Sequence, residues 1–211
     1  NSEKYAYIRT FGCQMNDHDS MKMRLLLEPL GYAFTDEPEQ ADLLIFNTCT
    51  IREKAYHKAI SDIGRSKFFK RRKKGTVPVI AVCGCVAQQE GTALTERFGH
   101  VDIVFGPDQI NELPRLLKEV EDSRPATALE LVNDPEAYDF LDDVPNRVDS
   151  GHSFVTVTKG CNCSCSYCIV PSVRGREVCR PAQDVISEVR HLAGAGAKEV
   201  TLLGQNVTSY R

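Results

Sequence analysis

The feature that most constrains the fold of this 211-residue chain is an alternation of strand-like and helix-like stretches over its first 120 residues. The first strand-like run alternates apolar and polar residues, and later ones are continuously apolar, as in strands buried on both faces. The expected strands are 5–11, 41–46, 77–82 and 101–105, and the expected helices are 17–30, 50–72, 88–98 and 110–120. Such alternation predicts an α/β fold with a doubly wound parallel sheet.

Three cysteines follow three of the four expected strands. Cys13, Cys49 and Cys85, called the rim cysteines below, are spaced 36 residues apart, each just beyond the carboxyl end of its strand. Open parallel sheets bind ligands in the crevice outside those ends, so the three thiols are expected at one rim. Buried structural thiols are the alternative, since free cysteine is among the most buried residue types. The equivalent topological positions favour a metal site.

A second group of cysteines lies in the nine-residue loop 160–168. Cys161, Cys165 and Cys168, called the loop cysteines below, form a C-x3-C-x2-C arrangement. Three thiolates can hold a cubane iron–sulfur cluster, which usually takes four, and they leave one iron open for another ligand. The alternative is a tetrahedral zinc site, because Cys163 supplies a fourth thiol within the loop.

The sequence around this loop predicts a β–loop–α–β unit. Residues 154–158 alternate as a strand, a helical stretch covers 182–195, and 199–203 form a second apolar strand. The loop therefore leaves the carboxyl end of a strand, where a β/α barrel carries its chemistry. The cysteine spacing, with Tyr167 just before the last thiol, resembles the cluster loop of the radical S-adenosylmethionine (SAM) superfamily. In that superfamily the open iron chelates SAM, which is then cleaved reductively.

Composition is that of a globular protein in a reducing compartment. The chain has 42% hydrophobic and 26% charged residues and a net charge of −3, without an apolar run long enough for a membrane helix or a signal-peptide pattern. Nine cysteines, clustered and odd in number, suit metal binding better than disulfides. Cys83 is expected in the core, and Cys163 and Cys179 are interpreted as bystanders. We expect a cytoplasmic monomer without membrane association.

Basic residues gather at two places in the sequence. Residues 65–74 contain seven basic side chains around two phenylalanines. Such a run is usually the solvated end of a helix, and contact with a phosphate backbone is the alternative. Arg174, Arg176 and Arg180 are better candidates for a phosphate contact, because they follow the cysteine loop.

The chain changes composition between its two halves. From residue 121 to 149 it has nine acidic residues against two arginines, interrupted by three prolines. This composition is typical of an extended linker. We therefore predict an N-terminal domain at 1–121, an acidic linker at 122–152 and the start of a second domain at 153–211.

Six segments together resemble the methylthiotransferase family, and the resemblance runs over essentially the full chain. They are 10–16 (TFGCQMN), 47–55 (NTCTIREKA), 84–88 (GCVAQ), 160–171 (GCNCSCSYCIVP), 174–177 (RGRE) and 203–207 (LGQNV). Within that family, the QMN, IREKA and GQNV variants resemble the MiaB-type tRNA enzymes. The type that acts on a ribosomal-protein aspartate usually differs at these segments.

The resemblance implies an enzyme that uses SAM and two [4Fe–4S] clusters. It places the SAM-cleaving cluster on the loop cysteines, with Tyr167 beside them, and an auxiliary cluster on the rim cysteines. No catalytic residue beyond these ligands is assigned. The implied substrate is tRNA with N6-isopentenyladenosine beside the anticodon, and the product carries a methylthio group on C2 of that adenine. Implied partners are the tRNA anticodon loop and proteins that donate sulfur and electrons.

The resemblance also implies what lies outside this sequence. Only the first β/α units of a radical SAM β/α barrel are expected here, since a closed barrel needs about 250 residues. The small RNA-binding β-domain of the family has no counterpart. The chain is therefore interpreted as an N-terminal part, inactive alone. Alternatives are a methylthiotransferase for another modified adenosine or a ribosomal-protein aspartate, and a metal-binding module without catalysis.

Overall fold

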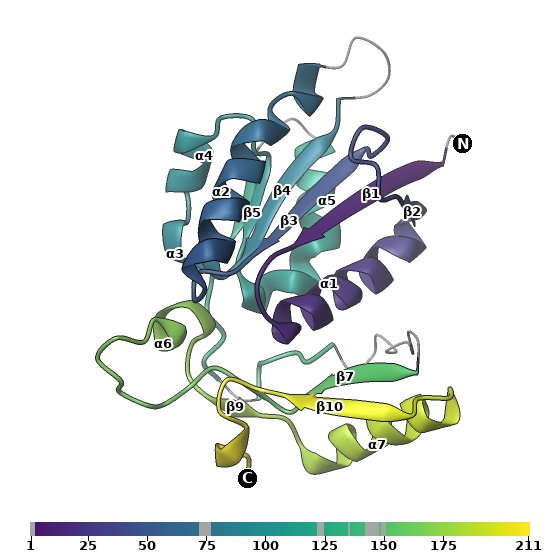
Figure 1. Ribbon diagram of the computed structural model, residues 1–211, viewed down its shortest axis with the longest axis vertical. Helices are drawn as coiled ribbons and strands as arrows, with labels where there is room; N and C mark the ends of the chain where they lie inside the picture. Colours follow the sequence, from purple (N-terminus) through teal and green to yellow (C-terminus); the bar gives the residue numbers. More distant parts are fainter. Residues whose placement is uncertain (1–2, 72–76, 122–124, 135, 142–147, 149–150) are drawn as a thin grey trace.

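A six-stranded parallel sheet dominates the computed structural model, which describes residues 3–71, 77–121, 125–134, 136–141, 148 and 151–211 (Figure 1). The strand order is β2-β1-β3-β4-β5-β6, and every neighbouring pair is parallel. The strands are β1 (Lys4–Thr10), β2 (Tyr32–Phe34), β3 (Leu43–Thr48), β4 (Val79–Gly84), β5 (Ile103–Phe105) and β6 (Ala126–Ala128). The predicted parallel sheet is confirmed.

Helices cover both faces of the sheet, as the alternation predicts. One face packs against α1 (Gln14–Leu27) and α5 (Leu113–Glu121), and the other against α2 (Glu53–Ser66), α3 (Cys85–Glu90) and α4 (Ala93–Arg97) (Figure 1). Within β3, Leu43 and Ile45 belong to the core on the α1 side, whereas Leu44 and Phe46 belong to the core on the α2 side. All six residues of β3 are buried, which explains its continuous apolar run.

The structure differs from the expected elements in several places. The edge strands β2 and β6 are unexpected, because three-residue runs are too short to show a period. β6 lies in the predicted acidic linker, and its Ala126 and Ala128 are buried in the sheet core. Gly91 separates α3 from α4, where one helix is expected. Short 3-10 turns are η1 (Glu28–Leu30), η2 (Phe69–Arg71), η3 (Pro107–Glu112) and η4 (Val207–Ser209). Parts of the linker and of the basic run, 72–74, lie outside the described residues.

A second unit contains the predicted β–loop–α–β arrangement. β7 (His152–Thr156) pairs in parallel with β10 (Glu199–Leu203), and α7 (Ala182–Gly194) packs against β7. The cysteine loop lies between β8 (Thr158–Lys159) and α6 (Val170–Arg174), and β8 pairs with β9 (Val178–Cys179). Figure 1 shows this unit beside the rim where β1, β3 and β4 end. No helix among the described residues is long and apolar enough to span a membrane.

Candidate metal centres

The rim cysteines lie where three neighbouring strands pass into helices. Cys13 directly precedes α1, Cys85 is the first residue of α3, and Cys49 begins the connection from β3 to α2. β1, β3 and β4 are adjacent in the sheet and parallel. The order of strands reverses between β1 and β3, and ligands bind open α/β sheets at such a switch point. The structure therefore brings the three residues to one rim.

The rim sulfurs interact with one another. The Cys49 thiol donates a hydrogen bond to the Cys13 sulfur, and this contact lowers the pKa of Cys13 to about 5. The same contact raises the pKa of Cys49, and both burial and the nearby Cys85 sulfur raise it further. Cys83 instead lies in the core, where its sulfur is 3.8 Å from the sulfur of Met23. Its side chain thus belongs to the packing of α1 on the sheet.

Backbone donors surround two of these sulfurs. The backbone N–H groups of Met15 and Asn16, in the first turn of α1, help to lower the pKa of Cys13. The N–H groups of Ile51 and Arg52 donate to the Cys49 sulfur. Free N–H groups at helix starts favour negative charge, and thiolates at such positions are stabilised. The rim is therefore suited to thiolate ligands.

Two buried asparagines hold the loops that carry Cys13 and Cys49. The Asn16 side chain donates to the Asn47 side-chain oxygen at 2.9 Å and to the Thr48 carbonyl at 3.0 Å. Asn47 in turn donates to the Asn16 carbonyl at 2.9 Å and to the Ser20 hydroxyl at 3.0 Å. These bonds fix the start of α1 against the end of β3. The sequence did not indicate this role, although both residues lie in the segments that carry the family resemblance.

Close backbone approach at the rim requires glycine. Gly84, just before Cys85, has φ +87°, and a Cβ atom there would come within 3.0 Å of the Thr48 carbonyl oxygen and the Asn47 side chain. Gly12, just before Cys13, has φ +120°, and a Cβ atom there would clash with Cys49. Side chains at either position would push the rim cysteines apart.

Gly84→Ala is therefore expected to lower the free energy of unfolding more than Gly31→Ala does. Gly31 has a similar φ of +83°, and a Cβ atom there would meet no other atom within 4 Å, so its substitution reports backbone strain alone, about 1–2 kcal/mol. Gly84→Ala should cost about 1–3 kcal/mol more, because β3 must move. Urea unfolding of both variants measures the difference. Equal losses would show that the rim tolerates a side chain at residue 84.

The cysteine loop is held at its base and open along its length. Gly160 has φ +71°, and its N–H donates to the side-chain oxygen of Gln205. Cys161 donates its N–H to the Gly175 carbonyl at 3.2 Å, which closes the loop at its start. Tyr167 at the tip is 89% exposed. An exposed loop with fixed ends leaves room for a ligand among its sulfurs.

The thiols of this loop differ in exposure. Cys165 is exposed, whereas Cys161 and Cys168 are half-buried. Cys163 is exposed too; its backbone N–H lies 3.4 Å from the Cys161 sulfur, and contact with that sulfur raises the pKa of the Cys163 thiol. Ligation by the loop cysteines, with Tyr167 near the cofactor and Cys163 as a bystander, remains a prediction.

Two hollows adjoin the two groups of cysteines. A cavity of about 240 Å³ lies between the rim and the second unit, with Cys13 and Cys85 on one side and Arg174 and Gln205 on the other. The Arg174 guanidinium also donates a hydrogen bond to the Cys85 sulfur. A more open hollow of about 590 Å³ adjoins Cys161 and Cys163. One loop cysteine and two rim cysteines therefore border space in which a ligand could lie.

Single-ion sites and cluster sites place their ligands differently. Across the described ranges, no three His, Cys, Asp or Glu side chains converge as ligands of one metal ion would. Cysteines that bind a cubane cluster hold different irons, so they surround a volume instead of meeting at a point. Two of the rim cysteines, Cys13 and Cys85, line the rim cavity, and a cluster held by all three remains a prediction.

Comparison with known proteins identifies the family. Residues 5–106 match the model of a family described as uncharacterized protein family UPF0004. The chain is 49% identical over 212 residues to a tRNA-2-methylthio-N(6)-dimethylallyladenosine synthase of Leptothrix cholodnii, and 50% identical over 210 residues to that of Methylibium petroleiphilum. The chain belongs to the methylthiotransferase family. These matches cover 100% and 99% of the chain but 44% of each relative, so it spans less than half of their length.

Solved structures show the same fold as this methylthiotransferase chain. The radical S-adenosylmethionine methyltransferase TsrM of Kitasatospora setae, with tryptophan substrate and a SAM analog bound, superposes with a TM-score of 0.59. The match covers 99% of this chain and 49% of TsrM at 16% sequence identity. The predicted α/β class, a parallel sheet followed by a β/α unit, is confirmed.

Buried ion pairs join the two units of the chain. Arg174 donates to Asp19 at 2.9 Å, and Lys159 donates to Asp108 at 2.7 Å. Arg180 pairs with Glu188 inside the second unit and is buried as well. The prediction that Arg174 and Arg180 contact a phosphate backbone is therefore wrong, because both guanidiniums are enclosed by protein.

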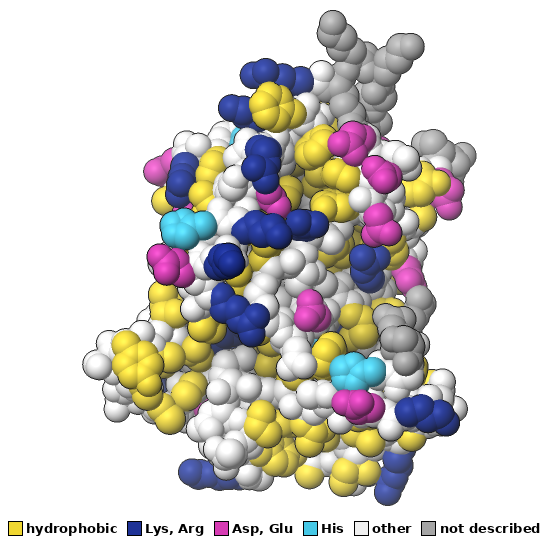
Figure 2. All heavy atoms as spheres, in the orientation of Figure 1, with side chains coloured by type: hydrophobic (Ala, Val, Ile, Leu, Met, Phe, Trp, Pro, Cys, Tyr) yellow, Lys and Arg dark blue, Asp and Glu magenta, His cyan; other side chains and the backbone are white. Residues whose placement is uncertain are grey.

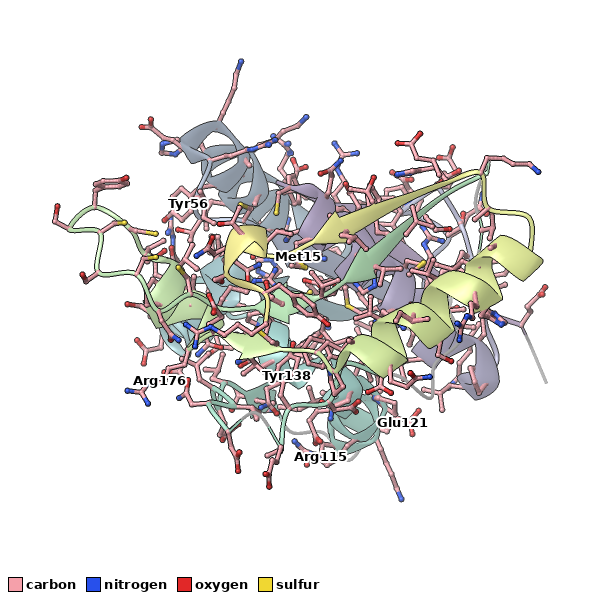
Figure 3. All side chains as sticks on the ribbon, turned by 90° about the horizontal axis from the view of Figure 1, so that it is seen from below. Met15, Tyr56, Arg115, Glu121, Tyr138 and Arg176 are labelled. Atoms are coloured by element: carbon pink, nitrogen blue, oxygen red, sulfur yellow. The ribbon has the colours of Figure 1, made fainter. Side chains whose placement is uncertain are left out.

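Arg176, the third arginine predicted to contact a phosphate, is not buried like the other two. Arg176 is exposed, and Figure 3 shows it near the edge of the molecule, away from the central Met15 and Tyr138. Met15 and Tyr138 line a small cavity of about 30 Å³ between the two units. A phosphate contact by Arg176 thus remains a prediction.

His18 on α1 lies within this interface. Burial, together with the charges of Lys22, Arg180 and Arg174, lowers its pKa to about 3. Among the described residues, its Nε2 atom has no hydrogen-bond partner. Burial raises the pKa of the neighbouring Asp19 to about 6, against the effect of Arg174. The unfolded chain therefore takes up a proton on His18 below about pH 6.5, while the folded chain does not.

His18→Gln is expected to make stability less sensitive to mild acid. The contribution of His18 to the free energy of unfolding is complete above pH 6.5 and is lost as pH falls toward 3. The contribution of Asp19 is lost as pH rises toward 6, and it is the same in both proteins. Relative to the variant, the native chain should lose about 2 kcal/mol between pH 7 and pH 5. Urea unfolding at both pH values measures this. Parallel losses in the two proteins would show that His18 titrates normally.

Proposed function

We propose that the full-length protein is a radical SAM methylthiotransferase that adds a methylthio group to C2 of N6-isopentenyladenosine beside the anticodon in tRNA. The observation that carries the proposal is an identity of about 49% to synthases of this name across the whole chain. The convergence of the rim cysteines beside the second unit supports it. Because the chain spans 44% of such a relative, the activity is proposed for the whole protein.

The cofactors belong to the same proposal. The loop cysteines would hold a SAM-cleaving [4Fe–4S] cluster with Tyr167 beside it, and the rim cysteines would hold an auxiliary [4Fe–4S] cluster. When bound, these groups supply the reductive cleavage of SAM and the sulfur that an unactivated aromatic carbon requires. A sulfur donor, a reductant protein, a monomeric state and a cytoplasmic location complete the proposal.

The chain's own residues position these groups. Backbone N–H groups at the helix starts favour negative charge on the Cys13 and Cys49 sulfurs, as thiolate ligands of a cluster would require. Arg174 carries a fixed positive charge to the Cys85 sulfur and is itself fixed by Asp19. Gln205 binds the base of the cysteine loop and also lines the rim cavity. The residue thus sets the position of the loop relative to the rim.

Nucleoside analysis of tRNA tests the proposal. The full-length protein, reconstituted anaerobically with iron and sulfide, is incubated with SAM, a reductant and tRNA that carries N6-isopentenyladenosine. Mass spectrometry of the digested tRNA should show the methylthio derivative, and tRNA with plain adenosine at that position should remain unchanged. Modification of a ribosomal-protein aspartate without any tRNA product would replace this proposal with the protein-modifying alternative.

A further inference from the structure

The outer face of α2 carries a strip of basic side chains that the proposed chemistry does not use. Lys54, Lys58 and Arg65 are exposed, and their spacing of four and seven residues places them on one face of the helix. At a rise of about 1.5 Å per residue, the strip is about 16 Å long. Figure 2 shows Lys and Arg side chains gathered over this face. We call these three residues the α2 strip.

The strip runs from the rim of the sheet to an aromatic surface. At the start of α2, the Arg52 guanidinium donates to the Gly12 carbonyl at 2.9 Å, directly beside Cys13. Beyond the other end of α2, Phe68 is 58% exposed. The Lys67 ammonium and the Arg71 guanidinium lie 5.5 Å and 5.8 Å from the centre of its ring. An exposed ring with two cations near it offers a stacking surface beside positive charge.

A hollow of about 460 Å³ adjoins Phe68. Its walls are aromatic rings and charged groups: Tyr7, Phe46, Phe68 and Phe69 with Arg9, Arg65, Asp62 and Glu39. A planar heterocycle with hydrogen-bonding edges suits such a lining, because the rings can stack on its faces and the charged groups can bind its edges.

Acidic residues neutralise only part of this surface. Asp62 accepts from Arg65 and lies 3.6 Å from Arg9, and Lys70 pairs with Asp102. Within the ranges that the structure describes, no carboxylate pairs with Lys54 or Lys58. The strip therefore keeps positive charge that a polyanion can bind.

We propose that the α2 strip and the hollow at Phe68 bind a single-stranded segment of RNA. Phosphates contact Lys54, Lys58 and Arg65, and an unpaired base stacks on Phe68. The combination of a cationic track and aromatic platforms is how proteins hold single-stranded nucleic acid. An acidic protein would use the cations but would have no need of the exposed ring. The choice of RNA rests on the proposed function, and the strip would direct RNA toward the rim.

Fluorescence anisotropy with the 211-residue chain and a fluorescein-labelled oligouridine RNA tests the proposal. Lys54→Gln, Lys58→Gln and Arg65→Gln should each weaken binding and reduce the slope of log affinity against log salt by about one. Phe68→Ala should weaken binding about 5- to 100-fold at an unchanged salt slope. Lys118→Gln on α5 and Lys198→Gln before β10 also remove exposed lysines and should bind as the native chain does. Circular dichroism confirms that each variant is folded.

Several outcomes would overturn the proposal. These are a native chain that binds no RNA at low salt, strip variants that bind as tightly as the controls, or control variants that lose as much affinity. Competition by polyglutamate as effective as that by unlabelled RNA, with no effect of Phe68→Ala, would assign the strip to an acidic protein. The proposed function is decided separately by the methylthio product of the full-length protein. A strip variant that forms product with an unchanged KM for tRNA would refute RNA binding by the α2 strip, and the proposed function would still hold.

Discussion

Alanine in place of any loop cysteine of the full-length protein is expected to abolish the cleavage of SAM to deoxyadenosine. Each substitution removes one of three ligands from a site that has none to spare. Alanine in place of a rim cysteine should leave this cleavage intact, because the loop cysteines lie between β8 and α6 of the second unit and not on the six-stranded sheet. Methylthiolation should nevertheless fail, since the ligands proposed for sulfur delivery are incomplete.

Measurement of deoxyadenosine and methylthiolated adenosine in the same reactions separates the two sets of variants. Cys83→Ala is the matched control, because it removes a thiol from the same end of β4. The sulfur of Cys83 packs against Met23 in the core and does not face the rim. It should retain both products. Rim variants that still form methylthiolated tRNA at normal yield would exclude the rim cysteines from sulfur delivery.

Lys159→Met is expected to destabilise the chain by about 3–5 kcal/mol. The side chains of Lys159 and Asp108 are 2% and 1% exposed, and they meet at 2.7 Å across the interface of the two units. Burial lowers the pKa of Lys159 and raises that of Asp108, while their contact opposes both shifts. Removal of the lysine therefore leaves a buried carboxylate without its cation.

The double variant tests this explanation. Asp108→Asn added to Lys159→Met removes the unpaired charge and should restore most of the lost stability. In the native chain the Val132 N–H donates to Asp108 at 3.0 Å, and the amide oxygen of asparagine can still accept this bond. Urea unfolding of the native chain, of Lys159→Met, of Asp108→Asn and of the double variant, followed by circular dichroism, gives the coupling energy. A loss below about 1 kcal/mol in the single variant would show that the pair is not enclosed in solution.

The parts of the fold that follow from periodicity could be predicted from the sequence. The strand at 199–203 occurs as predicted, and both ends of the strand predicted at 41–46 lie two residues from the ends of β3. Each rim cysteine could be placed because a parallel sheet brings the carboxyl ends of its strands together. β2 and β6 could not be predicted, since their pairing with long neighbours, and not their own three residues, makes them strands.

Side-chain partners far apart in sequence were beyond such reasoning. Arg174 follows the cysteine loop, and its proximity to the loop suggested a phosphate contact. Its partner Asp19 is 155 residues away, so nothing local to Arg174 indicated that the guanidinium is buried. The mutual bonds of Asn16 and Asn47 likewise arise only when α1 packs against the end of β3.

The most direct test of the central claim, that two groups of cysteines each hold a cluster, is iron and sulfide content. The full-length protein, reconstituted anaerobically, should bind about eight iron and eight acid-labile sulfide per chain. Replacement of all three rim cysteines by alanine should leave about four of each, and so should replacement of all three loop cysteines. Zinc without sulfide in the native protein, or an iron content unchanged in either triple variant, would contradict the account.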